Sequence, residues 1–293
     1  MTRLYALSAI LASALLFGAG TAAADCANPG AVEGVIIYNK DLCTIQFCNG
    51  TNWHLAAPPT CSGGSCSPMP PTSGLIAHWK LDENSGTTAY DNAGLNDGTL
   101  TDMDPATDWV AGKVGNALEF DGTDDHVLVG DVLDFGASDD FTISVWVYRD
   151  DTGRDDRVLW KKNSTNASDS GYLLYIDSGN DVRFFISDGT DQYFMQSTTD
   201  ILSPGWHHFV IVWDDDSAAG TKMYIDAADD NASHTGTISA IDSPSNAVPL
   251  TIGAESDLGK FFDGKLDDVR IYDRALTAQE VQDLYDAGNN GCS

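Results

Sequence analysis

Residues 116–129 read NALEFDGTDDHVLV, with two short alternating apolar runs on either side of a tight turn rich in carboxylates. Alternation of apolar and polar residues is typical of a half-buried β-strand. The turn between the runs carries Asp121 and Asp124 beside Gly122. Carboxylate oxygens are ligands that hard cations such as Ca²⁺ prefer. The stretch therefore predicts a strand that ends at a calcium site and turns back.

Two further segments have the same chemistry. Residues 91–100, upstream, read DNAGLNDGTL, and residues 264–272, downstream, read GKLDDVRIY. Both place Asp and Gly next to an apolar run, and the upstream segment adds two Asn. The three segments therefore predict acidic loops at the ends of strands.

From Gly74 onward, short apolar runs alternate with Gly, Asp and Asn, which predicts one strand after another. In residues 141–148, FTISVWVY, Phe, Ile and Val alternate with Thr, Ser, Trp and Tyr. The predicted strands are 75–81, 141–148, 157–161, 171–176, 182–187, 192–196, 206–213, 221–225, 250–252 and 265–272. Such a pattern favours two antiparallel sheets packed face to face. One helix is predicted over 277–287, where Thr277 and Glu280 form a capping box and Gly288 ends the helix.

The three acidic loops, the segment Arg274-Ala275-Leu276-Thr277 and the helix resemble the laminin-G-like jelly-roll domain of the concanavalin A-like lectin/glucanase superfamily. The resemblance runs from about Gly74 to Tyr285. It implies an all-β, two-sheet antiparallel jelly-roll sandwich with a short C-terminal helix, whose first and last strands are neighbours. It also implies a structural Ca²⁺ held by Asp91, Asn96, Asp121, Asp124 and Asp268. Taken alone, each of these aspartates is explained as well by an Asx-turn.

The chain is strongly acidic, with a net charge of −29 and a pI of about 4.1. This charge repels phosphate backbones and anionic lipid surfaces. We therefore expect no nucleic-acid partner. The excess of acid also fits solubility or a salty habitat, and only the clustered loop carboxylates favour cation binding.

The N-terminal segment has the layout of a secretory signal peptide over residues 1–24. Arg3 precedes an apolar run from Leu4 to Phe17, and Ala22-Ala23-Ala24 is followed by Asp25. We expect export and no membrane insertion of the mature chain. Its final place is the cell surface, the medium or the periplasm, which the sequence leaves open.

A small cysteine-bearing β-meander is predicted over 25–57, with strands at 34–39, 44–48 and 51–55. A Pro-, Ser- and Gly-rich linker follows over 58–73, the jelly-roll domain covers 74–288, and a tail covers 289–293. A module this small needs disulfides as staples. The cysteines are Cys26, Cys43, Cys48, Cys61, Cys66 and Cys292. We expect Cys26 to pair with Cys48. The resembled fold, in which first and last strands are neighbours, implies a clasp from Cys61 or Cys66 to Cys292.

Catalysis is not expected. Retaining glycosidases need two carboxylates close together, on one face of a strand. The glutamates show no such spacing, and Asp82 and Glu83 are adjacent, so they would point to opposite faces. The same argument separates His207 from His208, and no Gly-x-Ser-x-Gly motif is present.

Recognition is the expected role, with a glycan or an extracellular protein as ligand. Trp146 and Tyr148, which point together away from the aliphatic face of their strand, are the first candidates for a sugar-stacking surface. Other aromatic candidates are Trp160, Tyr172, Tyr175 and Tyr193. The alternative is a structural or assembly component of a cell-surface appendage. The oligomeric state is left open.

Overall fold

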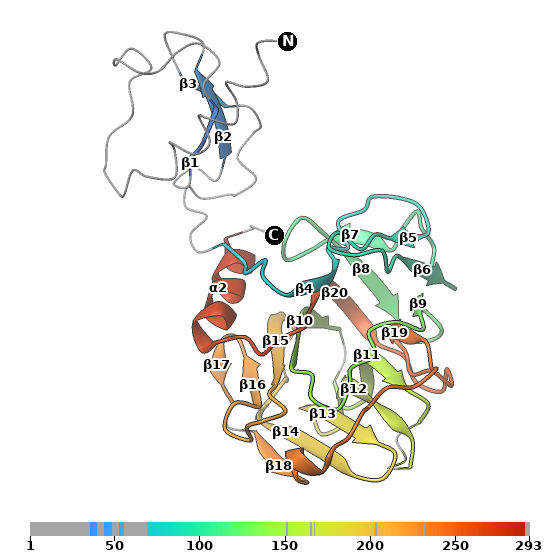
Figure 1. Cartoon of the computed structure of the whole chain (residues 1–293). Coiled ribbons are helices and arrows are strands. Elements are labelled where there is room, and N and C mark those ends of the chain that lie inside the picture. The colour runs from blue at the N-terminus through green and yellow to red at the C-terminus, as the bar shows by residue number, and fades with distance from the viewer. Residues whose placement is uncertain are drawn as a thin grey trace. The chain divides into compact units, whose positions relative to one another are not determined.

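The computed structural model describes residues 69–150, 152–164, 166, 168–202, 204–230 and 232–290, together with the backbone of three earlier strands. The chain divides into two compact units, one of residues 1–68 with 290–292, the other of residues 69–289 with 293 (Figure 1).

The N-terminal unit contains β1 (Ile36–Asn39), β2 (Thr44–Cys48) and β3 (Trp53–Leu55). They form one antiparallel sheet in the order β1-β2-β3. These strands lie where the sequence predicts a meander. The predicted signal peptide, residues 58–68 of the predicted linker and the cysteine side chains lie outside the described residues, so the signal peptide and the disulfides stay predictions.

The C-terminal unit consists of two antiparallel sheets. The eight-stranded sheet has the order β17-β16-β15-β10-β20-β8-β7, with β4 also paired to β20. Its strands are β4 (Leu75–Trp79), β7 (Trp109–Ala111), β8 (Asn116–Asp121), β10 (Phe141–Arg149), β15 (Trp206–Trp213), β16 (Lys222–Ile225), β17 (Ala228–Asp229) and β20 (Asp263–Tyr272).

The nine-stranded sheet has the order β18-β14-β13-β12-β11-β19-β9-β6-β5. Its strands are β5 (Thr88–Ala89), β6 (Gly98–Thr101), β9 (His126–Gly130), β11 (Asp156–Lys162), β12 (Ser170–Ile176), β13 (Asp181–Asp188), β14 (Gln192–Asp200), β18 (Ser233–Thr235) and β19 (Leu250–Ile252). One 3₁₀ turn, η1 (Ile238–Ala240), lies between β18 and β19.

The core lies between the two sheets and is built from alternate residues of each strand. Ile143, Val145 and Val147 on β10 belong to the same buried cluster as Leu174 and Ile176 on β12. Burying this apolar surface is the main favourable contribution to folding. The predicted all-β jelly-roll sandwich is confirmed. The first and last strands of the unit are neighbours, because β4 pairs with β20.

The helix α2 (Ala278–Asn289) packs on the outer face of the eight-stranded sheet, where Val281 and Leu284 join a cluster with Val210 and Val212. The predicted capping box is present, since the Thr277 N–H donates to Glu280 Oε2 at 2.9 Å and the Glu280 N–H donates to Thr277 Oγ1 at 3.3 Å. The prediction that Gly288 ends the helix is wrong. Gly288 is buried inside α2, next to the Trp146 ring, and the helix continues to Asn289.

The sequence patterns locate the long strands and miss short ones such as β7, β17 and β18. These have two or three residues each, too few to show a period. In the described part of the chain, no helix has the length and apolar character needed to span a membrane.

Candidate functional site

The outer face of the nine-stranded sheet carries a group of aromatic and polar side chains. Val182, Phe184 and Ile186 on β13, like Tyr193 and Met195 on β14, belong to the core. Because neighbouring strand residues point to opposite faces, the residues between them face outward. The outward residues on β12, β13 and β14 include Tyr175, Arg183, Phe185, Phe194 and Gln196, all half-buried. We call these five residues the aromatic face.

The strand register arranges the aromatic face in two adjoining rows. In one row, Arg183 lies between Tyr175 and Gln196. In the other row, Phe185 lies opposite Phe194. Rows on one face of a sheet are two residues apart, and neighbouring strands are about 4.8 Å apart. Strands β12, β13 and β14 lie side by side in the sheet (Figure 1). The five side chains are therefore neighbours on one side of three consecutive strands.

Cations hold the rings in place. The Arg157 guanidinium lies 4.9 Å from the Tyr175 ring centroid, and that of Arg183 lies 5.1 Å from the Phe194 ring. Lys162 Nζ lies 5.3 Å from the Phe185 ring, and burial lowers the pKa of Lys162 to about 8. Such contacts stabilise a fixed ring orientation. The surface is thus built before any ligand arrives.

Polar groups lie beside the rings. The Gln196 Nε2 amide donates to Asp181 Oδ2 at 2.6 Å. Arg183 pairs with Asp177 through Nε and approaches Asp181 Oδ2 with its Nη2 at 3.7 Å. An apolar surface with a few fixed polar groups is the usual character of a small-molecule site. This combination can pack against the C–H faces of a sugar and bond its hydroxyl groups.

The structure corrects the prediction for Trp146. Its side chain points away from the core as expected, but it is only 1% exposed. Tyr285 from α2 stacks on it at 5.5 Å and His208 stacks on it at 4.8 Å. Because the helix covers it, Trp146 cannot meet a ligand at the surface.

The other predicted aromatics divide into two groups. Tyr148 is half-buried on the outer face of the eight-stranded sheet, in an edge-to-face contact with Trp206 at 5.7 Å. Tyr175 belongs to the aromatic face. Trp160, Tyr172 and Tyr193 are buried. Phe185 and Phe194 are not among the predicted residues, although the alternation along β13 and β14 contained the signal.

The predicted calcium ligands do not come together in one place. Asp121 and Asp124 form a group with Asp125, in which one carboxylate oxygen of each lies within 4.8 Å of the others. Asp125, which the sequence analysis did not select, is buried and accepts the Asp121 N–H at 2.9 Å. Burial raises the pKa of Asp125 to about 6, and the neighbouring aspartates add to the effect.

Asp91, Asn96 and Asp268 lie elsewhere, so the structure does not bring the five predicted ligands together. Asp263 is the β20 residue opposite Asp121. Asp268 lies five residues farther along the strand, or roughly 16 Å at about 3.3 Å per residue. Asp91 is at that far end too, since it bridges to Trp79, which pairs with β20 at Val269.

Hydrogen bonds explain these acids without a metal. Asp91 accepts four backbone N–H groups, those of His78, Ala93, Gly94 and Asn96. This is the Asx-turn role that the sequence analysis held as the alternative. Asp268 is buried, bonds His78 Nε2 at 2.6 Å and pairs with Arg270 at 3.0 Å. These partners hold the pKa of Asp268 well below its ordinary value despite its burial.

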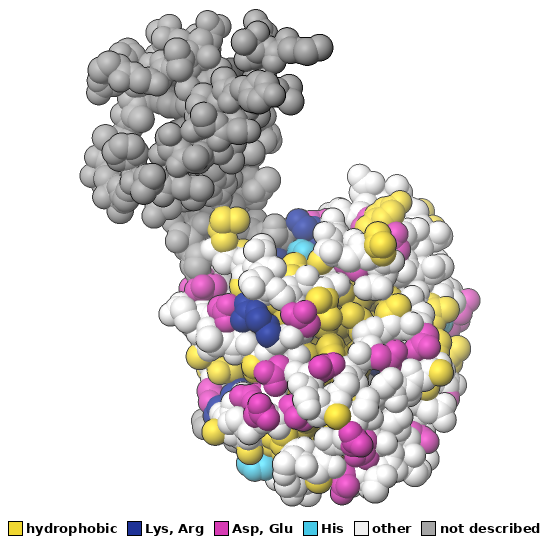
Figure 2. All heavy atoms as spheres, viewed as in Figure 1, with side chains coloured by type: hydrophobic (Ala, Val, Ile, Leu, Met, Phe, Trp, Pro, Cys, Tyr) yellow, Lys and Arg dark blue, Asp and Glu magenta, His cyan; other side chains and the backbone are white. Residues whose placement is uncertain are grey.

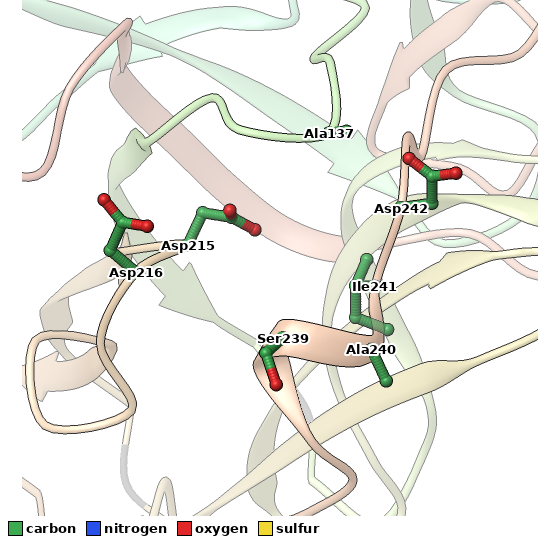
Figure 3. Close-up of a pocket in the computed structure, with 7 residues that line it drawn as sticks. All are labelled: Ala137, Asp215, Asp216, Ser239, Ala240, Ile241 and Asp242. Atoms are coloured by element: carbon green, nitrogen blue, oxygen red, sulfur yellow. The ribbon is translucent and has the colours of Figure 1, made fainter.

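An acidic hollow of about 470 Å³ lies elsewhere on the unit (Figure 3). Asp215 and Asp216 form one side and the segment Ser239 to Asp242 forms another. Burial and the neighbouring aspartates raise the pKa of Asp215. Figure 2 shows Asp and Glu side chains spread over the visible face of this unit, with few Lys or Arg side chains among them. The hollow is one part of this general acidity.

Comparison with known proteins identifies the fold. The model of the concanavalin A-like lectin/glucanases superfamily matches residues 121–282. No curated protein matches the sequence. Domain 4 of AbnA, an extracellular arabinanase from Geobacillus stearothermophilus solved with arabinotriose, is similar with a TM-score of 0.52 and 20% identity, covering 73% of this chain and 98% of that one.

Two other solved structures share the fold. The botulinum neurotoxin serotype D ligand-binding domain, solved with N-acetylneuraminic acid, has a TM-score of 0.54 at 15% identity, covering 74% of this chain and 51% of that one. Trypanosoma rangeli sialidase has a TM-score of 0.54 at 16% identity, covering 76% of this chain and 34% of that one. The chain thus spans about half the length of the neurotoxin domain and about a third of the length of the sialidase. Identities this low support a common fold only.

Proposed function

The chain belongs to the concanavalin A-like lectin/glucanases superfamily, and from this we propose that it binds carbohydrate, without catalysis, through the aromatic face. The arrangement of that face carries the proposal. Three rings stand on three consecutive strands, each with a cation against it and with Gln196 and Arg183 beside it. Two of the similar structures were solved with sugars, arabinotriose and N-acetylneuraminic acid, which supports a sugar as ligand.

The surface around Tyr148 is the rival site. It offers two rings, Tyr148 and Trp206, with Lys265 Nζ 4.8 Å from the Tyr148 ring. Lys265 itself pairs with Glu119 at 3.1 Å. We favour the aromatic face because it has three rings, each with a cation against it, whereas the Tyr148 surface has two rings and one cation. The Tyr148 surface supplies a matched control on the other sheet.

Binding by the full chain to an array of neutral and acidic oligosaccharides, including arabinotriose, tests the proposal. Phe185→Ala and Phe194→Ala each remove one ring that stacks against sugar. Since an aromatic contact contributes about 1 kcal/mol or more, we expect each variant to lose on the order of tenfold in affinity. Tyr148→Ala should bind like the wild type.

Loss of binding in the control variant would place the sugar site on the other sheet. If Tyr148→Ala lost binding while both phenylalanine variants kept it, the sugar would lie on the eight-stranded sheet. Failure of the folded wild type to bind any sugar would leave an extracellular protein as the ligand, or the assembly role. Turnover of a bound oligosaccharide, detected as new reducing ends, would contradict the non-catalytic assignment.

We also propose that Asp121, Asp124 and Asp125 hold a structural Ca²⁺. Three carboxylates within 4.8 Å of one another fit a hard cation by donor chemistry. Burial raises the pKa of Asp125 to about 6 and repulsion from the neighbouring aspartates adds to it, so a positive charge beside the three carboxylates would be stabilising. When bound, the ion would tie the end of β8 to the start of β9.

Thermal unfolding in calcium and in chelator tests this site. We expect the wild type to melt higher in calcium, and Asp121→Asn to lose that difference. Asp216→Asn, which removes one exposed acid in the hollow, is the control and should keep it. An equal melting temperature in calcium and chelator would rule the ion out.

We further propose that the chain is exported, which residues 1–24 support. Fractionation of cells that produce the full chain, with and without residues 1–24, is the test. Retention of both forms in the cytoplasm would contradict export.

A further inference from the structure

We propose that the aromatic face selects neutral glycans and rejects glycans that carry a carboxylate. This inference rests on the proposed carbohydrate binding and names the class of sugar. The inference is drawn from the charges around the aromatic face. The cations there already contact carboxylates or carbonyl groups of the protein.

Arg183 is the central cation of the face, and two carboxylates share it. Asp177 contacts Arg183 Nε, and Asp181 Oδ2 lies 3.7 Å from Nη2. Asp181 also accepts from Gln196, so the amide that could donate to a ligand points at an acid. One guanidinium between two carboxylates leaves this part of the surface negative.

The neighbouring cations are occupied as well. Arg157 pairs with Glu255 at 3.0 Å and lies 4.0 Å from Asp155. Lys162 Nζ donates to the backbone carbonyl of Asn166 at 2.7 Å and to that of Asp169. Among the described residues, Arg183 on the aromatic face and the two cations that contact its rings, Arg157 and Lys162, thus all have internal partners.

Recognition of a carboxylate needs the opposite arrangement. An arginine that binds a sugar carboxylate presents its N–H fork with both arms open. Here an acidic sugar would have to displace Asp177 or Asp181, and it would meet the field of a chain with a net charge of −29. A neutral sugar meets no such repulsion, and it can use Asp181 and Gln196 as partners for its hydroxyl groups.

The test compares glycans that differ by one acidic sugar. Full-length protein is applied to lactose-terminated glycans and to the same glycans capped with sialic acid. A second pair is a neutral oligosaccharide and its uronate-containing counterpart. We expect binding to neutral members only, with on the order of tenfold or greater preference at low salt. Added NaCl should narrow the difference by screening.

Asp181→Asn tests the cause. The substitution keeps an acceptor for Gln196 while it removes one of the two negative charges at Arg183. At about 6 Å and a dielectric near that of water, one unit charge corresponds to on the order of a threefold change in binding. We expect the ratio of acidic-glycan affinity to neutral-glycan affinity to rise by about that factor. Asp283→Asn on α2, an equal change of net charge on the other sheet, is the control.

The outcomes separate the two proposals. Preference for the acidic member of either pair overturns the selection while it leaves carbohydrate binding intact. If Asp181→Asn and Asp283→Asn gained equally in relative affinity for the acidic glycan, the net charge of the chain alone would explain the preference. That result would overturn the proposal that the charges of the aromatic face select neutral glycans. Absence of binding to every glycan overturns carbohydrate binding and the inference with it.

Discussion

His208 shows how one buried residue makes stability depend on pH. It lies between the eight-stranded sheet and α2, stacked on Trp146, with Ser144 Oγ 2.8 Å from Nε2. Its Nδ1 atom has no hydrogen-bond partner among the described residues. Burial lowers its pKa from 6.5 to about 3. The unfolded chain therefore binds a proton near pH 6.5, whereas the folded chain does not until about pH 3. The free energy of unfolding falls as pH decreases through this window.

His208→Phe should flatten that pH dependence. The aromatic ring is kept, but it binds no proton. Between pH 6.5 and 4.5 we expect the variant to lose roughly 2–3 kcal/mol less stability than the wild type, at about 1.4 kcal/mol per pH unit. At pH 7 the free energy of unfolding of the variant should be about 1 kcal/mol lower than that of the wild type, because the hydrogen bond to Ser144 is lost. Urea unfolding at several pH values measures both effects.

The exposed His234 supplies the control, and His234→Gln should keep the wild-type slope. An unchanged slope in His208→Phe would mean that His208 is not the group that takes up the proton.

At the scale of the element, α2 decides which aromatics of the eight-stranded sheet reach solvent. Trp146 and Tyr148 stand at alternate positions of β10 and point to the outer face of this sheet. The helix covers Trp146 and leaves Tyr148 half-buried. Gly288 permits this approach. A Cβ added at Gly288 would lie 2.5 Å from Trp146 Nε1 and 2.6 Å from ring carbons.

The added methyl group in Gly288→Ala should therefore push α2 away from the sheet. We expect a loss of about 1–3 kcal/mol, the usual cost of overpacking, and a change in the fluorescence of the buried Trp146. Gly205→Ala is the matched control, since its added Cβ has no heavy atom within 4 Å. Equal melting temperatures for the two variants would show that the helix adjusts without strain.

At the scale of the whole molecule, acidity is the dominant feature. The chain has 44 acidic and 15 basic residues. Many acids cap turns, as Asp91 does, so they stabilise the fold locally while they repel one another over longer distances. The balance between these effects depends on ionic strength.

Salt should therefore raise the melting temperature. At low ionic strength, charges about 10 Å or more apart still interact, and in molar salt they do not. If screening relieves about 1 kcal/mol, the increase is on the order of 2–4 °C for a domain of this size. Differential scanning calorimetry from low to high NaCl in chelator is the measurement. A melting temperature that falls with salt would show that favourable ion pairs outweigh the repulsion.

The sequence by itself determined the sandwich, its long strands and the capping box of α2. These features depend on alternation within a strand and on residues three apart, such as Thr277 and Glu280, which are local properties. Along β10 it also determined which side faces the core, whereas Tyr172 and Tyr193, predicted as surface candidates, belong to the core. The predicted outward direction of Trp146 and Tyr148 is correct for this reason.

Only the tertiary structure decided what meets those outward side chains. Trp146 is covered because a helix more than a hundred residues later in the chain packs over it. The predicted calcium ligands Asp121 and Asp268 lie apart because the register of β20 puts Asp263, not Asp268, opposite Asp121. The aromatic face exists because three strands pair in one register. Register and coverage arise from contacts between distant segments, and no local pattern specifies them.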